Sequence, residues 1–366
     1  MSMDPVELTR ALLRCNSVTP RDGGAQAVLI HALEGLGFTV TKLRFGEIEN
    51  FFAERVGAGR HLCFAGHTDV VPPGHGWGHD PFGAEEIEGI VYGRGAVDMK
   101  GGIAAFVAAA LSTPGHVSLL ITGDEEGEAK DGTVRVLEWL AARGRMPDFC
   151  VVGEPTCRAR LGDVVKIGRR GSLNARITVT GRQGHAAYPH LADNAVHRIL
   201  PLLQELSGTR LDEGTEAFEP SSLQITTVDV GNEVTNVIPG QVSARLNIRF
   251  NELHSGASLS AWLERRIGAH CPGARLEVSV SGESFRSRPG EGLAALLAAI
   301  EAETGESPEQ NTGGGTSDAR FIARYCPVAE FGLVGATMHK VDEAVAVADL
   351  HRLSAIYARF IKGFCS

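Results

Sequence analysis

The chain has 366 residues, of which 43% are hydrophobic and 22% are charged. This composition is typical of a globular protein, and the length favours two domains over one. The formal net charge of −9 and the pI near 5.8 disfavour nucleic acid or an anionic membrane surface as a general partner. No uninterrupted apolar stretch is long enough for a membrane-spanning helix, which needs about 18 residues or more.

The seven cysteines are scattered, odd in number and without CxxC spacing. This usage fits a reducing compartment better than a disulfide framework. Residues 1–20 lack the basic start, apolar stretch and small-residue cleavage site of a secretory signal. We therefore expect a cytoplasmic protein.

In the first 170 residues, strands are predicted to alternate with helices. Asp4 is a favourable N-cap and Pro5 a favourable first helical residue, and the apolar residues that follow have helical spacing. Short apolar runs that end in polar residues predict buried strands at 60–67, 116–123 and 148–154, with helices at 101–111 and 133–144. The predicted fold class is α/β, in which ligands gather beyond the carboxyl ends of the strands.

From about residue 171, polar and apolar residues alternate, as in strands with one solvated face. These strands are predicted at 172–181, 221–230, 241–250 and 274–282, with helices near 192–206 and 257–269. We interpret 171–281 as an inserted α+β domain. A helix, a short strand and a long terminal helix follow, so the first domain is predicted to comprise 1–170 and 282–366.

The first candidate site is "GHTDVVPPG", in which His67 and Asp69 end an apolar run. Residues two apart on a strand face the same side, so the two can act as one unit: His67 offers a nitrogen to a metal, and Asp69 accepts the proton of the other ring nitrogen. Taken alone, a histidine at a strand end is more often a structural group than a metal ligand.

Two acidic stretches come next. Asp98 lies in the Gly-rich turn of "YGRGAVDMKGG", directly before a predicted helix, where an aspartate is also a common N-cap. Asp124, Glu125 and Glu126 follow a buried strand. Three adjacent carboxylates usually form a solvated loop, but at the end of a buried strand they repel one another unless a cation is present.

Glu154 in "VVGEPT" and His339 in "ATMHKVDE" are individually unremarkable. Together with the preceding stretches they supply nitrogen and carboxylate ligands of the kind that divalent first-row metals, and zinc in particular, prefer. The set as a whole predicts a metal site.

The stretches "GHTDVVPPG", "YGRGAVDMKGG", "DEEG", "GEPT" and "HKVDE" are similar to the two-zinc aminoacylase and carboxypeptidase (M20-type) family of hydrolases. The resemblance covers essentially the whole chain. It implies a zinc-exopeptidase-like catalytic domain with a mixed central sheet, and an inserted α+β dimerisation (lid) domain. Further stretches, "GRRGSLNARITVTGRQGHAAYPHLADNAVH", "TNVIPG", "LNIRF" and "NTGGGTSDARFI", resemble a branch that hydrolyses N-succinyl-LL-2,6-diaminopimelate to succinate and LL-2,6-diaminopimelate, in the biosynthesis of diaminopimelate and lysine.

The resemblance implies two Zn²⁺ ions per subunit, for which Co²⁺ can substitute. His67 and Glu154 would hold one ion, Glu126 and His339 the other, and Asp98 would bridge them. Asp69 would orient His67, and Glu125 would be the general base, taking a proton from water and passing it to the leaving amine.

The resemblance also implies a homodimer, in which His185 reaches the partner's active site and stabilises the oxyanion. His190 is a weaker choice, and His185 alone could equally cap a loop before Pro189. The small-molecule substrate bears carboxylates, and the positions that match substrate-binding residues of the family are Arg169, Asn236, Arg249, Gly315 and Thr316. Arg170 competes with Arg169, and "GGGTS" alone would read as a flexible loop.

Other classes are less favoured. The chain has no GxSxG nucleophile elbow and no cysteine in an evident catalytic setting. A non-catalytic binding protein on the same fold would be expected to lack Glu125 or a ligand, and all are present. The alternative is another amidohydrolase of the same family, such as an acetylornithine deacetylase or an aminoacylase.

Overall fold

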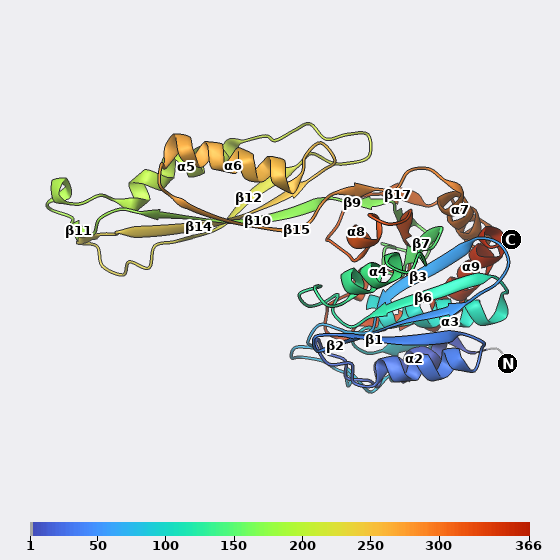
Figure 1. Cartoon of the computed structure of the whole chain (residues 1–366). Helices are drawn as coiled ribbons and strands as arrows, with labels where there is room; N and C mark the ends of the chain where they lie inside the picture. The colour runs from blue at the N-terminus through green and yellow to red at the C-terminus, as the bar shows by residue number, and fades with distance from the viewer. Residues whose placement is uncertain (1–2) are drawn as a thin grey trace. The chain divides into compact units, whose positions relative to one another are not determined.

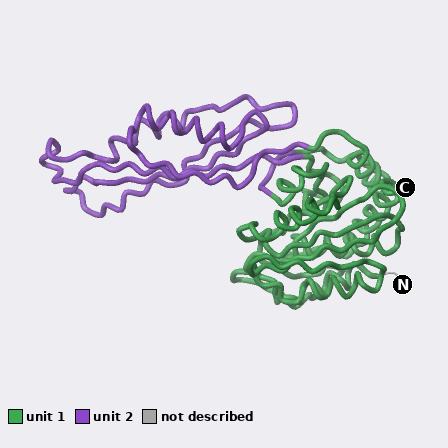
Figure 2. The backbone as a smooth tube through the Cα atoms, viewed as in Figure 1, with its two compact units in different colours: residues 1–167, 287–311, 317–366 green, residues 168–286, 312–316 purple. Residues whose placement is uncertain are grey.

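A computed structural model describes residues 3–366, which form two compact units (Figure 2). Of the described residues, unit 1 comprises 3–167, 287–311 and 317–366, and unit 2 comprises 168–286 and 312–316. Each unit has its own hydrophobic core, so each can be described by itself.

Unit 1 is built on a mixed eight-stranded sheet with the strand order β1-β2-β6-β3-β7-β18-β8-β17 (Figure 1). Its strands are β1 Thr39–Phe45, β2 Ile48–Arg55, β3 His61–His67, β6 His116–Thr122, β7 Phe149–Val152, β8 Val164–Lys166, β17 Glu309–Asn311 and β18 Val328–Glu330. The central pairs β6–β3, β3–β7 and β7–β18 are parallel, whereas β1–β2 and β2–β6 are antiparallel. A smaller sheet joins β4 Glu86–Ile87, β5 Ile90–Tyr92 and β19 Ala344–Ala346.

The helices of unit 1 are α1 Pro5–Leu13, α2 Ala25–Glu34, α3 Gly101–Ser112, α4 Thr133–Ala141, α7 Glu291–Thr304, α8 Ala319–Ile322 and α9 Val347–Phe364. Helix α3 is apolar on all sides, and it is buried against α1 and α9. Phe106 of α3 stacks on Phe64 of β3 with ring centroids 4.5 Å apart, and the buried ring of Tyr357 from α9 meets both edge-on. The core therefore holds β3 and α3 in fixed positions relative to each other. β3 carries one candidate site residue, and α3 directly follows the turn that carries another.

Unit 2 contains a four-stranded antiparallel sheet with α5 and α6 packed on one face (Figure 1). Its elements are β9 Gly168–Arg169, β10 Gly171–Thr180, β11 Gly184–His185, α5 Ala195–Gly208, β12 Ser222–Asp229, β13 Val237–Ile238, β14 Gln241–Phe250, α6 Gly256–His270, β15 Arg275–Gly282 and β16 Phe285–Arg286. Along β10, alternate residues from Leu173 to Val179 are buried under the helices. This matches the alternation in the sequence, which is what a sheet with one solvated face requires.

The prediction of an α/β fold with a mixed central sheet is confirmed. The predicted N-cap is also present: the Asp4 carboxylate accepts a hydrogen bond of 2.9 Å from the backbone N–H of Val6. None of the helices described within residues 3–366 is long and apolar enough to cross a membrane.

Candidate active site

Three neighbouring parallel strands of unit 1 deliver candidate residues to the same edge of the sheet. His67 is the last residue of β3 and lies opposite Thr122, the last residue of β6, after which the chain enters a turn at 125–128. Glu154 follows the end of β7 by two residues. Because parallel strands end at one edge, histidine and carboxylates distant in the sequence meet there.

Gly153 makes this convergence sterically possible. A Cβ atom at this position would lie 2.3 Å from Cζ of Phe64 and 2.7 Å from Cε of Met99, far inside van der Waals contact. Only glycine therefore allows the end of β7 to pass so close to the core beneath the site.

Asp98 and His339 complete the cluster from two loops. Asp98 lies in the turn Ala96–Lys100 directly before α3, and its Oδ1 is 3.3 Å from Nε2 of His67. His339 Nε2 lies 3.1 Å from the other oxygen of Asp98 and 2.8 Å from Oε1 of Glu126. His339 has a left-handed backbone with φ of 60°, which a non-glycine residue adopts at a cost in free energy.

The donor set fits divalent cations. Among the described residues, the buried atoms His67 Nε2 and Asp98 Oδ1 have no hydrogen-bond partner, an arrangement that is costly unless something else satisfies them. His67, Asp98 and Glu126 place one ligand atom each within 4.8 Å of the others, and so do His67, Glu125 and Glu154. Both groups combine carboxylates with an imidazole, a donor set that zinc uses in proteins, and both use the single free ring nitrogen of His67, which can ligate one ion.

The position of Asp69 differs in detail from the expected carboxylate–imidazole pair. His67 Nδ1 makes its hydrogen bond, 2.9 Å long, to the backbone carbonyl oxygen of Asp69, and the carboxylate lies 3.6 Å away. The Asp69 carboxylate instead accepts hydrogen bonds from Thr19 Oγ1 and from the backbone N–H groups of Glu125 and Glu126. Asp69 thus fixes both the ring of His67 and the backbone of the acidic turn.

Burial and mutual charge shift the titration of the cluster. Burial, followed by the neighbouring charge of Glu154, raises the pKa of Glu125 well above its ordinary value, which brings this carboxyl closer to the pH at which a general base works best. Asp98 and Glu126 raise the pKa of His339 to about 10. Burial opposes a charge on His67, yet Asp69 and Asp98 raise the pKa of His67 well above its ordinary value. The cluster thus carries enough negative charge to hold protons, or cations in their place.

Two residues near the site were not predicted. Asp318 is buried with Oδ1 unpartnered among the described residues, burial raises its pKa, and it interacts electrostatically with His67. Glu343 accepts hydrogen bonds from the backbone N–H groups of Val97 and Asp98. Both lie inside stretches that resemble the family, "GGGTSDARFI" and "HKVDE". The only feature of the sequence that could have identified them as site residues is that each is an acidic residue within such a stretch.

His185 and Asn236 come together at one end of unit 2. The two-residue strands β11 and β13 pair His185 with Val237, and the backbone N–H of Ala186 donates to the carbonyl of Asn236. His185 is exposed, and its Nδ1 accepts a hydrogen bond from the N–H of Ala187. The donor proton of a neutral His185 is therefore on Nε2.

The remaining predicted residues also lie in unit 2. Arg169 donates a hydrogen bond to the carbonyl of Gly315, so Arg169 and the 312–316 segment, with Thr316, are neighbours. Burial and the adjacent charge of Arg170 lower the pKa of Arg249. Arg170 also pairs with Glu219 at 3.5 Å, and the two neighbouring arginines together form a region of positive charge that favours an anion.

Comparisons with known proteins agree with this architecture. The pattern of peptidase family M20/M25/M40 matches residues 63–363. The chain is 60% identical to a succinyl-diaminopimelate desuccinylase of Acidiphilium cryptum, over 98% of each chain. It is 62% identical to a protein of the same name from Gluconacetobacter diazotrophicus, over 99% of this chain and 97% of the relative.

Solved structures show the same fold at low identity. A metallo-carboxypeptidase from Sulfolobus solfataricus superposes with a TM-score of 0.80 at 15% identity, over 99% of both chains. A dinuclear metal-binding M20 peptidase of Bacillus subtilis superposes with a TM-score of 0.70 at 16% identity, over 98% of this chain and 96% of the other. From the match over most of its length and the high identity to full-length relatives, the chain belongs to peptidase family M20/M25/M40.

Proposed function

We propose that the chain hydrolyses the succinyl amide of N-succinyl-LL-2,6-diaminopimelate, giving succinate and LL-2,6-diaminopimelate for diaminopimelate and lysine biosynthesis. The high identity to full-length desuccinylases supports this substrate. The observation that supports this chemistry is the buried cluster around His67 Nε2 and Asp98 Oδ1. Among the described residues these two polar atoms have no hydrogen-bond partner, and a bound cation would satisfy both.

Five residues are proposed to hold two Zn²⁺ ions, for which Co²⁺ can substitute: His67, Asp98, Glu126, Glu154 and His339. Bound divalent cations supply charge that polarises an amide carbonyl and makes water more acidic. Asp98 is proposed as the shared ligand because its two oxygens face different histidines, His67 and His339.

Glu125 is proposed as the general base. Its carboxylate takes a proton from the attacking water and delivers it to the amide nitrogen as the carbon–nitrogen bond breaks, so that the amine leaves neutral. The turn that carries it is held by the carboxylate of Asp69, through the N–H groups of Glu125 and Glu126. Because the backbone of the turn is held in one conformation, each of the two adjacent carboxylates keeps its own position and can keep its own role.

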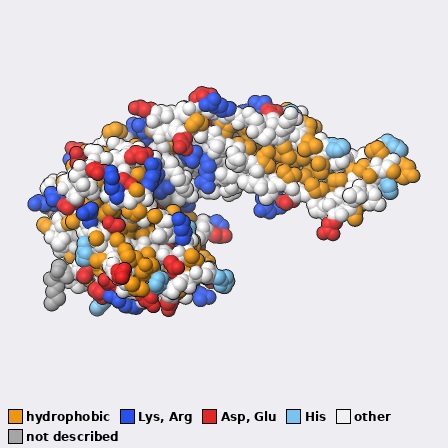
Figure 3. All heavy atoms as spheres, turned by 180° about the vertical axis from the view of Figure 1, so that it is seen from behind, with side chains coloured by type: hydrophobic (Ala, Val, Ile, Leu, Met, Phe, Trp, Pro, Cys, Tyr) orange, Lys and Arg blue, Asp and Glu red, His pale blue; other side chains and the backbone are white. Residues whose placement is uncertain are grey.

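His185 is proposed to donate its Nε2 proton to the oxyanion in the active site of a partner subunit, in a cytoplasmic homodimer. In support, His185 is exposed, and the edge strands β12 and β15 of the same unit expose Val228, Val278 and Val280. Hydrophobic side chains are visible on the surface of this unit in Figure 3. Exposed apolar edge strands commonly pair with another chain.

Arg169, Asn236, Arg249, Gly315 and Thr316 are proposed to bind the carboxylates and polar groups of the substrate. The arginines of unit 2 offer forked donors that match a carboxylate.

The assignment of substrate and metal dependence is tested by comparing the turnover of N-succinyl-LL-2,6-diaminopimelate with that of N-acetylornithine, with and without exhaustive chelation. Preference for the succinylated substrate and loss of activity on chelation are expected. A preference for N-acetylornithine would favour the deacetylase instead.

A further inference from the structure

A second group of metal-type side chains lies at the opposite edge of the unit 1 sheet. His61 is the first residue of β3, His116 is the first residue of β6, and Glu54 lies near the end of the antiparallel strand β2. The strands are neighbours in the order β2-β6-β3. One side chain from each of three adjacent strands therefore meets at a single point.

The three side chains bring one ligand atom each within 4.8 Å of the others. The rings of His61 and His116 stack, with centroids 4.1 Å apart and planes 8° apart. Oε1 of Glu54 lies 3.0 Å from Nε2 of His116 and 3.9 Å from Nε2 of His61. Ligand atoms around a tetrahedral zinc ion are about 3.4 Å apart, given bonds of about 2.1 Å. Because imidazole lone pairs lie in the ring planes, the two stacked rings would turn relative to each other to direct both nitrogens at one ion.

The surroundings prepare these side chains as ligands. Burial, and then the neighbouring His116, lower the pKa of His61 to about 4, so this imidazole is neutral at pH 7, as a metal ligand must be. Arg145 pairs with the other oxygen of Glu54, which leaves Oε1 facing the two rings. Such an outer partner orients a ligating carboxylate. Nε2 of His61 shares a hydrogen bond of 2.7 Å with the hydroxyl of Ser118, a contact that a bound ion would replace.

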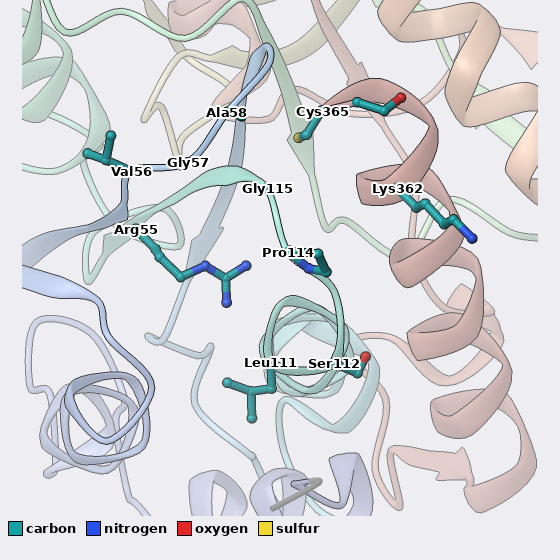
Figure 4. Close-up of a pocket in the computed structure, with 11 residues that line it drawn as sticks. Arg55, Val56, Gly57, Ala58, Leu111, Ser112, Pro114, Gly115, Lys362 and Cys365 are labelled. Carbon is teal, nitrogen blue, oxygen red and sulfur yellow. The ribbon is translucent and has the colours of Figure 1, made fainter.

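The group is separate from the candidate active site. His61 and His67 stand at the two ends of β3, six residues apart, which corresponds to about 20 Å. It is also distinct from a nearby cavity of about 660 Å³ lined by Arg55, Gly115, Lys362 and Cys365 (Figure 4). Arg55 in that cavity already donates hydrogen bonds to the carbonyls of Ala110 and Thr113. It therefore has few N–H groups left to bind an anion.

We infer that Glu54, His61 and His116 bind one divalent transition-metal ion of the zinc class, which cross-links β2, β6 and β3. Two imidazoles and one carboxylate are a donor set that zinc uses in proteins, with the fourth position left to water. His116 is partly exposed, with 21% of its side chain accessible, so an ion can enter from solvent. The site serves the fold and takes no part in hydrolysis.

The test compares ions bound per chain in the full-length protein after dialysis against buffered Zn²⁺, measured by elemental analysis. His116→Gln keeps a side-chain donor for Glu54 but is a poor zinc ligand, and Glu54→Gln removes the anionic ligand. Each variant is expected to hold one ion fewer than the unaltered protein while its hydrolytic activity, which also reports correct folding, is retained.

His79→Gln is the matched control. His79 also pairs with a carboxylate, Glu85, at 3.0 Å and stacks on the ring of Tyr92, but within residues 3–366 it belongs to no group of three metal-type ligands. It should bind as many ions as the unaltered protein. Equal ion counts in the unaltered protein, His116→Gln and Glu54→Gln would overturn the inference, whatever the occupancy of the candidate active site.

Discussion

Arg94 donates a hydrogen bond of 2.6 Å to Oε2 of Glu343, and both side chains are almost wholly buried. The second oxygen of Glu343 accepts from the N–H groups of Val97 and Asp98, at 3.0 and 3.2 Å. Glu343 lies four residues after His339. The pair therefore ties the turn that carries Asp98 to the loop that carries His339.

Replacing this carboxylate should loosen the metal cluster. Glu343→Gln leaves the charge of Arg94 buried and unpaired, and we expect Zn²⁺ affinity to fall by about 10-fold or more, as for other residues that orient ligands. The measurement is competition with a chromophoric chelator. Glu85→Gln, at an exposed ion pair, is the control. Unchanged affinity in Glu343→Gln would show that Asp98 is positioned without it.

Substitutions of the two adjacent glutamates in the acidic turn should distinguish the general base from the metal ligand. Glu125→Gln is expected to keep both ions and lose about 10²- to 10⁴-fold in kcat, because it removes only the proton carrier. Glu126→Gln should lose Zn²⁺ affinity as well, because its Oε1 faces His339. Elemental analysis of both variants alongside kcat checks this, and equal metal loss in the two would mean that base and ligand are exchanged.

His185 offers a test of the dimer. His185→Ala and Glu125→Gln should each turn over poorly, the first through loss of an oxyanion donor, a change typically of about 10²- to 10³-fold. A mixed dimer contains one site with both an intact Glu125 and an intact His185 from the other subunit. Mixing and refolding the two variants should therefore raise the activity well above the sum of the parents, up to the fraction of sites that mixed dimers restore. Activity no higher than the sum of the parents would place His185 in its own subunit's site or outside catalysis.

Asp212 of unit 2 gives a prediction for pH. Burial disfavours its charge, but hydrogen bonds from Ser221, the N–H of Gly214 and the amide of Asn251 lower the pKa of Asp212 from 3.8 to about 2. The stability that the carboxylate contributes is thus complete above the unfolded pKa and is lost as the pH falls through the folded pKa.

The unfolding free energy of the unaltered protein, minus that of Asp212→Asn, should shrink by about 1 kcal/mol from about pH 5 to about pH 3. Urea unfolding followed by the fluorescence of Trp262, in the same unit, measures it once Trp77 and Trp139 are replaced by phenylalanine. A difference that does not vary with pH would mean that the pKa of Asp212 is the same in both states.

The central sheet could be predicted because its middle strands are continuous apolar runs. His67 and Glu154 follow such runs, so their approach at one edge follows from parallel pairing alone. The assignment of individual residues to the two zinc ions rests on the resemblance to the family and stays a prediction. Strands β8 and β17 have three residues each, and such lengths carry no periodicity. Their pairing brings together residues more than 140 positions apart, which only the folded chain decides.

The contacts of Asp69 and Glu343 could not be predicted for a different reason. Both carboxylates accept from backbone N–H groups in loops, and the direction of a loop N–H is set by tertiary packing and not by residue type. Strand alternation was expected to place Asp69 beside His67, but β3 ends at His67 and Asp69 lies beyond it, so the imidazole bonds the backbone carbonyl of Asp69 and leaves the carboxylate to the acidic turn.

Anomalous diffraction at the zinc absorption edge, from crystals of the full chain equilibrated with Zn²⁺, tests the metal cluster most directly. Two adjacent peaks bounded by His67, Asp98, Glu126, Glu154 and His339 are expected. Peaks confined to other parts of the chain, with these five side chains unliganded, would contradict the proposed chemistry.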